Sequence, residues 1–463
     1  MIKSCIALAL LSVASSSVRA QDALGLLEVY DLALLNDPVI REAEANFMAT
    51  SEVKRQARSN LLPSLSLGSS LSDLSSVNPN PPLDFITGEP STFISSTELD
   101  QDQSSLSLSL NQTVFNWGQI LSLQQADKTI LRAETDLLAT QQDLMIRVAS
   151  AYFNVLASED LLAADIAARE ALGQQLEQTR RRFDVGLIAI TSVQEAQAGY
   201  DQSVAAVIAS ERVLATARES LREIISEYVT DLKSPIEELP LLNPDPEDVD
   251  VWVETAQAQN LGLVSSRIAA DIAQDDIRIA RSVRFPTLSL SASSSDSTST
   301  ASQTSNLFSG GSFSPGSTSS DRESDTIQLS FSLPIFNGGG NRSRIRQSVY
   351  RERAAIETVE RIARQTERLT RDAYLGVTSE ISRVEALRQA LESSRTALLA
   401  TQAGEEVGQR TGVDVVNAQN NVRRAETTYA GARYEYLLNI LRLKQAAGSL
   451  AEADLVEIDG WLQ

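Results

Sequence analysis

Two kinds of hydrophobic periodicity divide the chain. Residues 119–183 and 192–228 are rich in Ala, Leu and Gln and contain no proline, which predicts two long helices. Residues 61–72 and 105–115 instead place an apolar side chain at every second position, and this alternation predicts β-strands. Shorter amphipathic helices are predicted over 22–36 and 39–60.

This order of elements occurs twice along the chain. The segment ARSNLLPSLSLG, which contains Pro63, returns as ARSVRFPTLSLS with Pro286, 223 positions later, and Gly408 follows Gly186 by 222 positions. Coincidence between two alanine-rich helical hairpins does not explain strands, loops and turns that match in one order, so we infer a tandem duplication. We expect a first repeat over 21–234, a connector over 235–250 and a second repeat over 251–463.

The pattern of the second repeat predicts the same elements as that of the first. Each long hairpin is expected to turn at a glycine, which is typical of a left-handed helix cap. The two tips are expected near 183–191 and 405–413. The further predicted elements are a helix over 251–284, strands near 285–293 and 327–336, and polar loops over about 73–103 and 293–325 that join the strands of each pair.

The first twenty residues predict a secretory signal. Lys3 precedes a short apolar stretch over 6–13, and Val18-Arg19-Ala20 is typical of a cleavage site. The only cysteine, Cys5, lies in this signal, and the chain has no histidine. We therefore expect no disulfide, no metal site, no cofactor and no enzymatic activity. A periplasmic hydrolase would need a polar pocket, which the repeats do not indicate.

The charge excludes a further class of partner. The chain carries 40 basic and 61 acidic residues, and loss of Lys3 and Arg19 with the signal leaves 38 against 61, a net charge of -23. Such an acidic surface disfavours nucleic acid as a partner. An acidic balance also keeps an exported protein soluble, which accounts for most of this charge without any further role.

Alternation of apolar with small polar residues is typical of transmembrane β-barrel strands, although half-buried strands of an ordinary sheet show the same pattern. Closed membrane barrels begin at about eight strands, so four strands cannot close one within a single chain. Several chains must then share one barrel. The long helices also need neighbours on both sides, because a single pair buries little, and a ring of chains with a central space meets both requirements. Three chains would give twelve strands, and the pattern also permits two or four chains.

The segment RFDVGLIAITSVQEAQAGYD, together with the tandem order of helices and strands, resembles the TolC-like outer membrane factor family. The resemblance covers nearly the whole chain after the signal. It implies a mainly helical protein with transmembrane β-strands, in which a trimer forms a shared twelve-stranded barrel in the outer membrane and an α-helical tunnel in the periplasm. It also implies an exit duct for small molecules or secreted proteins, opened by a periplasmic adaptor and an inner-membrane pump.

Within this family the first hairpin tip docks the adaptor. Val185, Gly186 and Leu187 match the docking motif and offer an exposed apolar knob, although a simple helix-capping glycine with apolar neighbours would look alike. Val407 and Gly408 keep only part of the motif in the second tip.

The resemblance further places a periplasmic gate at the second tip. Asp414 matches the first ring of inward acidic side chains, and Asn417 stands where an aspartate is common. An aspartate near a helix start is also favoured by the helix dipole alone. Arg410 and Thr191 match one closing link, whereas Ser192 and Glu405 depart from the residues of the other link, which puts that second link in doubt.

One further class of protein is compatible with the helices. A trimeric coiled-coil fibre or surface adhesin would use the same apolar stripes without forming a pore. It would have no strands in lipid, and this difference separates it from the outer membrane channel.

Overall fold

The computed structural model describes residues 23–79, 96–236, 238–306, 312–314 and 316–463. The predicted signal over 1–20 lies outside these residues, as do the central parts of the two loops. The described chain divides into two units, each described by itself. The first comprises the hairpin ends of the long helices, and the second comprises the strands and the helices that adjoin them.

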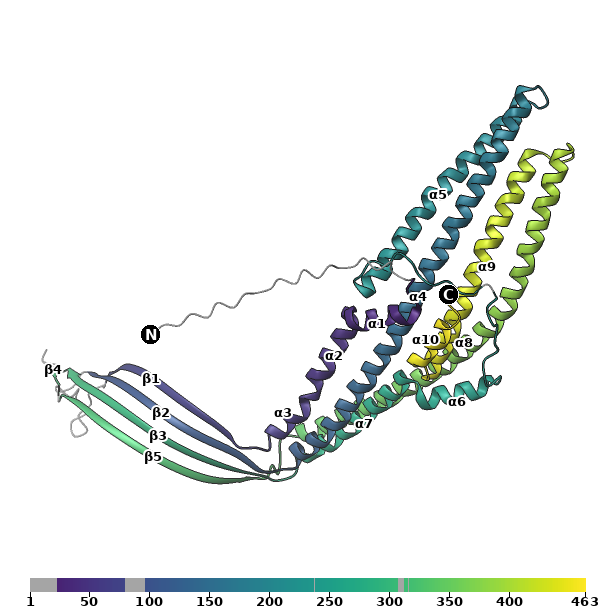
Figure 1. The fold of residues 1–463 in the computed structure, drawn as a ribbon. Coiled ribbons are helices and arrows are strands. Elements are labelled where there is room, and N and C mark those ends of the chain that lie inside the picture. The colour runs from purple at the N-terminus through teal and green to yellow at the C-terminus, as the bar shows by residue number, and fades with distance from the viewer. Residues whose placement is uncertain (1–22, 80–95, 237, 307–311, 315) are drawn as a thin grey trace, which may run out of the picture. The chain divides into compact units, whose positions relative to one another are not determined.

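Long helices dominate both halves of the chain (Figure 1). The helices predicted over 119–183 and 192–228 correspond to α4, Trp117–Asp184, and α5, Ile190–Ile225. Their counterparts in the second half are α8, Gly340–Glu406, and α9, Gly412–Ala447. The shorter helices are α1 Leu26–Asn36, α2 Pro38–Ser51, α3 Val53–Ser59, α6 Val249–Gln259, α7 Leu261–Ser282 and α10 Glu452–Asp459.

The helix predicted over 251–284 is wrong as a single element, because the structure divides it into α6 and α7. The break falls at Asn260, whose backbone is extended rather than helical, with φ −57° and ψ 118°. The Asn260 side-chain oxygen accepts a hydrogen bond from the Leu263 N–H at 3.1 Å, which caps the start of α7. Asparagine forms such caps readily, and this signal was available in the sequence.

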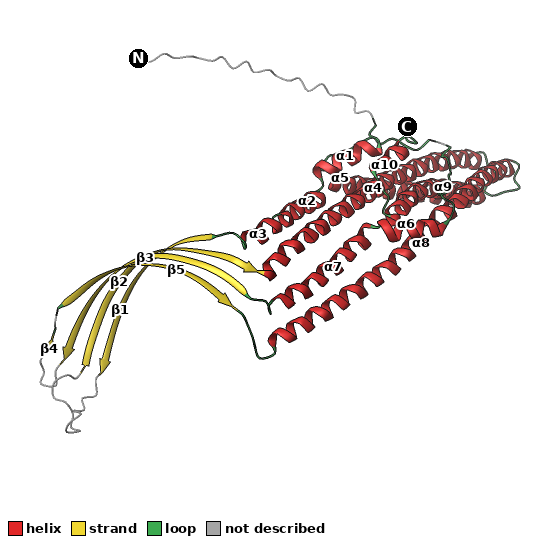
Figure 2. Ribbon diagram, turned by 90° about the horizontal axis from the view of Figure 1, so that it is seen from below, coloured by secondary structure: helices red, strands yellow, loops and turns green. Residues whose placement is uncertain are grey.

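The second unit contains an antiparallel sheet, and Figure 2 shows its strands in yellow, side by side. Strand β2 pairs with β1 on one side and with β3 on the other, and β3 also pairs with β5. The bounds are β1 Ser64–Pro79, β2 Ser96–Asn116, β3 Thr287–Asn306, β4 Ser312–Phe313 and β5 Ser317–Ser332. Among the described residues, β1 and β5 each have one unpaired edge.

These strands correct the predicted loops over 73–103 and 293–325, much of which is strand. Strand β1 has 16 residues and β2 has 21, whereas a strand needs only about 9–11 residues to cross a bilayer. Backbone pairing continues where the apolar alternation stops, because the ladder hydrogen bonds do not depend on side-chain polarity. The sequence pattern therefore revealed only the apolar part of each strand.

The register sorts side chains onto two faces of the sheet. One row across the four long strands consists of Leu65, Leu110, Ala292 and Ile327. We call this side the apolar face; in this row Leu65 and Ile327 are 66% and 81% exposed, whereas Leu110 is partly buried. The other large members of the apolar face are Leu67, Leu71, Val77, Leu106, Leu108, Phe115, Leu288, Leu290, Leu329 and Phe331.

Toward the loop ends of the strands, the apolar face ends in carboxylates. Along each strand they are separated from the apolar residues of this face by an even number of positions, so they project from the same side of the sheet. We call this set the acidic rim; it consists of Asp73, Glu98, Asp100, Asp102, Asp296, Asp321, Glu323 and Asp325.

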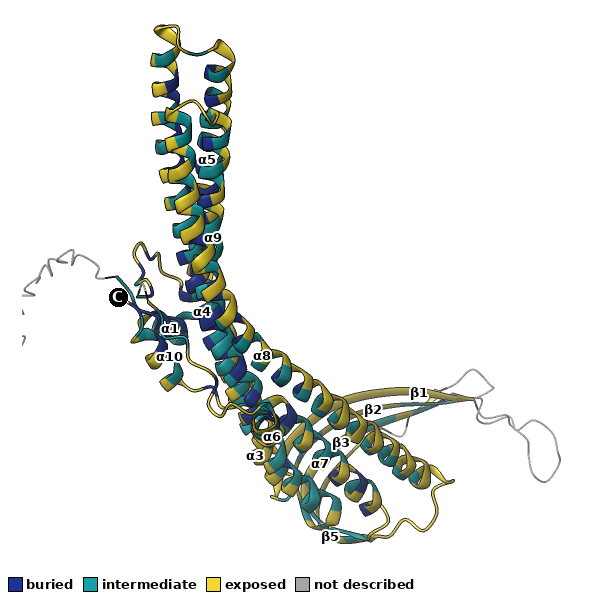
Figure 3. Cartoon of the chain, turned by 90° about the vertical axis from the view of Figure 1, so that its right-hand side faces the viewer, coloured by how far each residue is buried: buried dark blue, intermediate teal, exposed yellow. Residues whose placement is uncertain are grey.

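A hydrophobic core in the first unit joins α4, α5 and α9, and Figure 3 shows buried residues along these helices. Phe153 packs edge-on against Tyr152 and stacks on Tyr434 at a ring distance of 5.8 Å. The Tyr152 hydroxyl donates to the backbone oxygens of Leu24 and Lys233, at 3.1 and 2.7 Å. Full burial of such side chains contributes about 1.5–3 kcal/mol each, so this core fixes the base of both long hairpins.

A buried ion pair fixes the junction of α1 and α2 to α4. The side chain of Asp37 is 2% exposed and lies 2.7 Å from Arg147. Burial alone would raise the pKa of Asp37, but hydrogen bonds from Arg147 and from the N–H groups of Ile40 and Val39 lower it overall. The ionised pair therefore holds the two helices in place.

None of the described helices is long and apolar enough to cross a membrane.

Candidate functional site

The first hairpin tip, between α4 and α5, is a tightly hydrogen-bonded turn. Gly186 adopts the left-handed conformation with φ 78°. Its N–H donates to the Phe183 oxygen at 2.8 Å, and the Leu187 N–H donates to the Arg182 oxygen at 2.9 Å. These two bonds define a Schellman cap, which satisfies the last carbonyls of α4. A side chain at Gly186 would meet nothing within 4 Å, so the backbone angle alone requires glycine there.

The second tip, between α8 and α9, repeats this geometry. Gly408 has φ 74°, its N–H donates to Glu405 at 3.0 Å, and the Gln409 N–H donates to Gly404 at 2.8 Å. The two tips therefore share this cap, and the second adds a hydrogen bond from the Arg410 N–H to the Gly404 oxygen at 3.1 Å.

The turn over 185–187 in the first tip exposes two apolar side chains, and the corresponding turn over 407–409 in the second exposes one. Val185 is 70% and Leu187 is 74% exposed, and Val407 is 70% exposed. Figure 3 shows exposed residues at both tips. Gln409 occupies the place of Leu187 in the second tip. The first tip is therefore better suited to bind an apolar partner surface, because burial of its two side chains would remove more apolar area from water.

An ion pair that the sequence analysis missed joins the two tips. Arg182 in the last turn of α4 binds Glu405 in the last turn of α8 through its guanidinium, and the two side chains are 26% and 14% exposed. A glutamate at a helix C-terminus is disfavoured by the helix dipole, so Glu405 requires a cation nearby. That unfavourable position, facing an arginine-rich turn over 180–182, is the signal that could have identified the pair.

Deeper in the hairpins, α9 is held against α4 by two further polar contacts. Buried Asp165 pairs with Arg423 at 3.1 Å, and the Tyr434 hydroxyl donates to Asp160 at 2.6 Å. Burial, with the nearby Asp160 carboxylate, raises the pKa of Tyr434 far above its ordinary value, so the hydroxyl keeps its proton. Of the contacts described here, the Arg182–Glu405 pair lies closest to the tips.

Asp414 closes a capping box at the start of α9. Its carboxylate accepts hydrogen bonds from the Thr411 N–H and hydroxyl, both at 2.9 Å, and its own N–H donates to the Thr411 hydroxyl at 3.3 Å. The hydrogen bond from the Thr411 backbone, joined by the Thr411 hydroxyl and the charge of Arg410, holds the pKa of Asp414 below its ordinary value. Its carboxylate thus stays ionised near the tip.

The other predicted gate residues are near the tips but are not joined to each other. Arg410, Thr191 and Asn417 are exposed. In the described part of the chain, no side-chain hydrogen bond joins Arg410 to Thr191, and the Arg410 stem instead lies over Gly404. The link between them stays a prediction for the assembled protein.

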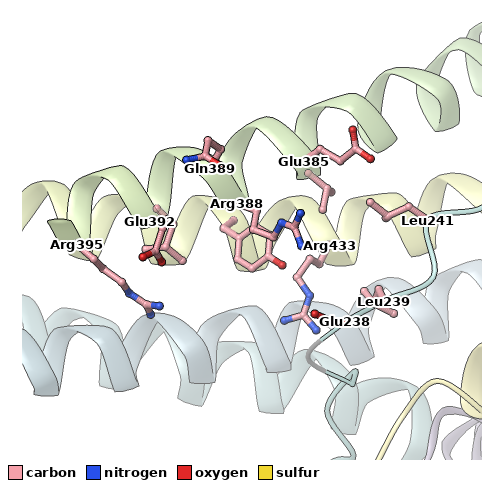
Figure 4. A pocket seen from close by; sticks show the side chains of 12 residues that line it. Glu238, Leu239, Leu241, Glu385, Arg388, Gln389, Glu392, Arg395 and Arg433 are labelled. Carbon is pink, nitrogen blue, oxygen red and sulfur yellow. The ribbon is translucent and has the colours of Figure 1, made fainter. Parts of the chain in front are cut away.

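A groove of about 760 Å³ lies elsewhere in the first unit, between α8, α9 and the segment after Pro235 (Figure 4). Its lining alternates arginines with glutamates, and Arg433 donates to the backbone oxygens of Pro235 and Ile236. No serine, threonine, cysteine or histidine lines it. No group of three or more acidic, cysteine or histidine side chains in the described part of the chain is placed to hold a metal ion.

The chain combines long antiparallel strands that have an exposed apolar face with two long helical hairpins. This combination defines a class of outer membrane channels that contain both β-strands and long helices. The solved Campylobacter jejuni CmeC outer membrane channel has this fold, with a TM-score of 0.71 at 17% identity over 94% of this chain and 89% of that one. The family model for outer membrane efflux proteins matches residues 29–227 and 252–449.

Two relatives are similar over most of their length. The outer membrane protein TolC of Escherichia coli is 34% identical, covering 94% of this chain and 85% of TolC. The alkaline protease secretion protein AprF of Pseudomonas aeruginosa is 27% identical, covering 94% and 86%. The chain belongs to the outer membrane efflux protein family. The predicted fold class, family and outer membrane location are thereby confirmed.

Proposed function

We propose that three copies of this chain form one exit duct, which carries small molecules or secreted proteins from an inner-membrane pump, through a periplasmic adaptor, to the outside of the cell. The two relatives described above, an outer membrane TolC and a protease secretion protein, support both kinds of cargo. In this assembly the protein contributes a conduit and no chemistry of its own.

The observation that supports a barrel shared between chains is the open sheet. Four long strands with an exposed apolar face leave the edges of β1 and β5 unpaired in the described chain. Unpaired backbone groups are not tolerated in hydrocarbon, and closed barrels need about eight strands or more. Pairing of β5 with β1 of the next copy removes every edge, and three copies supply twelve strands.

Membrane fractionation tests this proposal against a surface fibre. A protein with a shared barrel should stay in the outer membrane after washes with carbonate or urea and should leave it only in detergent. A coiled-coil fibre without lipid-embedded strands would be released by the washes, which would contradict the proposal.

Docking is assigned to the first tip, at Val185, Gly186 and Leu187. Two exposed apolar side chains on a rigid Schellman cap give an adaptor a small, preorganised anchor. Val407 and Gly408 offer the same backbone with one apolar side chain, so their contribution is smaller.

The gate is assigned to the end of the hairpins. The Arg182–Glu405 pair holds the tips of one chain together, and Asp414 with Asn417 and the predicted Arg410–Thr191 link complete the closed end. Adaptor binding would separate the tips at the Arg182–Glu405 pair, while the Asp165–Arg423 and Tyr434–Asp160 contacts hold the hairpins together further in.

Divalent cations should block the closed end through Asp414, and the block should tolerate mild acid. The pKa of Asp414 is lower in the folded protein than in the unfolded chain. Capping of α9 by the carboxylate therefore stabilises the fold fully above the ordinary aspartate pKa of about 3.9. This stabilisation is lost as the pH falls through the lower pKa of the folded protein. The carboxylates are then still charged at about pH 5, so block measured in planar bilayers should be retained there.

Two variants calibrate that measurement. Asp414→Asn keeps the shape of the side chain and should lose most of the block, whereas Asn417→Asp adds a second ring of carboxylates and should strengthen it. Block that is unchanged in Asp414→Asn would refute the assignment of this residue.

A further inference from the structure

Charged side chains in the sheet are distributed unequally between its two faces. Every carboxylate of the described strands belongs to the acidic rim, on the same side of the pleat as the leucines. The opposite side, which we call the polar face, consists mainly of serine, threonine, glutamine and asparagine, with Leu74 and Leu99 as its large apolar members. Hydroxyl pairs cross this face, as between Ser66 and Ser109 and between Ser70 and Ser105, both at 2.7 Å.

Arg322 is the one charged residue on the polar face among the described residues of the sheet. Its cross-strand partner is Ser297, on the same face, and the Ser297 hydroxyl donates at 3.4 Å to the Arg322 backbone oxygen. Among the residues that the structure describes, no hydrogen bond engages the Arg322 guanidinium. Arg322 is exposed. Its chain neighbours Asp321 and Glu323 project from the other face, because successive residues of a strand alternate.

The guanidinium of Arg322 therefore has no carboxylate beside it to neutralise its charge. In the described part of the chain it makes no ion pair, although the protein as a whole is strongly acidic. An arginine keeps its charge at every physiological pH and offers a planar fork of donors that fits phosphate and carboxylate groups. A positive charge placed alone on a neutral wall attracts anions and repels cations.

We propose that Arg322 lines the interior of the barrel and forms, with its copies in the other chains, a ring that binds anionic groups on molecules passing through the duct. This inference rests on the proposed trimeric duct, in which the apolar face meets lipid and the polar face meets the water-filled interior. The ligand class is an anion with phosphate, sulfate or carboxylate groups. Arg322 acts as a determinant of charge selectivity at the loop end of the barrel, opposite in sign to the proposed ring of Asp414.

The test uses single channels of the full-length protein in planar bilayers, with inositol hexakisphosphate as a polyanionic probe. The probe should block the current from one side only, because Asp414 repels it at the other end of the duct. Arg322→Ser should weaken the apparent affinity for the probe by at least about tenfold, which corresponds to roughly 1.4 kcal/mol. Arg322→Lys should retain most of the block, and high salt of about 1 M should abolish it.

The pleat supplies matched controls on the same strand. Asp321→Ser and Glu323→Ser each remove one charge next to Arg322 from the opposite face, and both should leave the block unchanged within about twofold. Equal block in the wild type and in Arg322→Ser would overturn the proposal, as would loss of block in the two controls alone. Absence of any conductance in the wild type would instead overturn the proposed duct, so the two failures are distinguishable.

Discussion

Replacement of Leu187 by glutamate should abolish export while the protein still assembles in the outer membrane. Leu187 is 74% exposed at the first tip, where its side chain makes no contribution to the core. A charge at this position should therefore leave stability within about 0.5 kcal/mol of the wild type. At an apolar docking surface, however, the same charge would be buried without a partner, which costs several kcal/mol and a large factor in affinity.

The measurement is export of a dye or a secreted reporter by cells, normalised to the amount of trimer in the outer membrane. Leu187→Met keeps the apolar volume and should retain export. Val407→Glu places the same charge on the corresponding cap of the second tip and should cost less, because the turn over 407–409 presents one apolar side chain. Normal export by Leu187→Glu at normal abundance would remove the docking assignment.

Reversal of either charge in the Arg182–Glu405 pair should open the closed end, and reversal of both should close it again. Arg182→Glu or Glu405→Arg places two like charges together where the side chains are only 26% and 14% exposed. For such a partly exposed pair, about 1–2 kcal/mol of closed-state stability should be lost, a factor of about 5–30 in the open population. The double variant restores an opposite pair and most of that stability.

Channel openings at fixed voltage measure this effect directly, and sensitivity of cells to large antibiotics measures it in vivo. The two single variants should open frequently, whereas the wild type and the double variant should open rarely. If the double variant opens as often as the single ones, the pair does not hold the gate, and the tips are held by contacts between chains.

The sequence predicted the long helices and the two tips well, for a physical reason. Residues 117–184 form one helix because nothing in them breaks it, and Gly186 and Gly408 end the helices because only glycine adopts their left-handed backbone at low cost. These signals are local, so a single sequence contains them.

The strands and the ion pair at the tips were predicted less well, because they depend on partners distant in the chain. Most of β2 carries polar side chains that read as a loop, and only its ladders with β1 and β3 keep it extended. Glu405 reads as a departure from the family's gate, yet in the fold it meets Arg182, which lies 223 positions away. The charged residues likewise could be assigned to the two faces of the sheet only once the pairing register of the strands was known.

A pore with a cation-sensitive closed end is the central property of the proposed duct. Purified wild-type protein should therefore be reconstituted in planar bilayers and its single-channel current recorded with and without millimolar divalent cations. We expect discrete, uniform channels whose current the cations block from one side, and we expect Asp414→Asn to remove this block. A protein that inserts no conducting channels, or channels indifferent to divalent cations in both forms, would contradict the proposed duct.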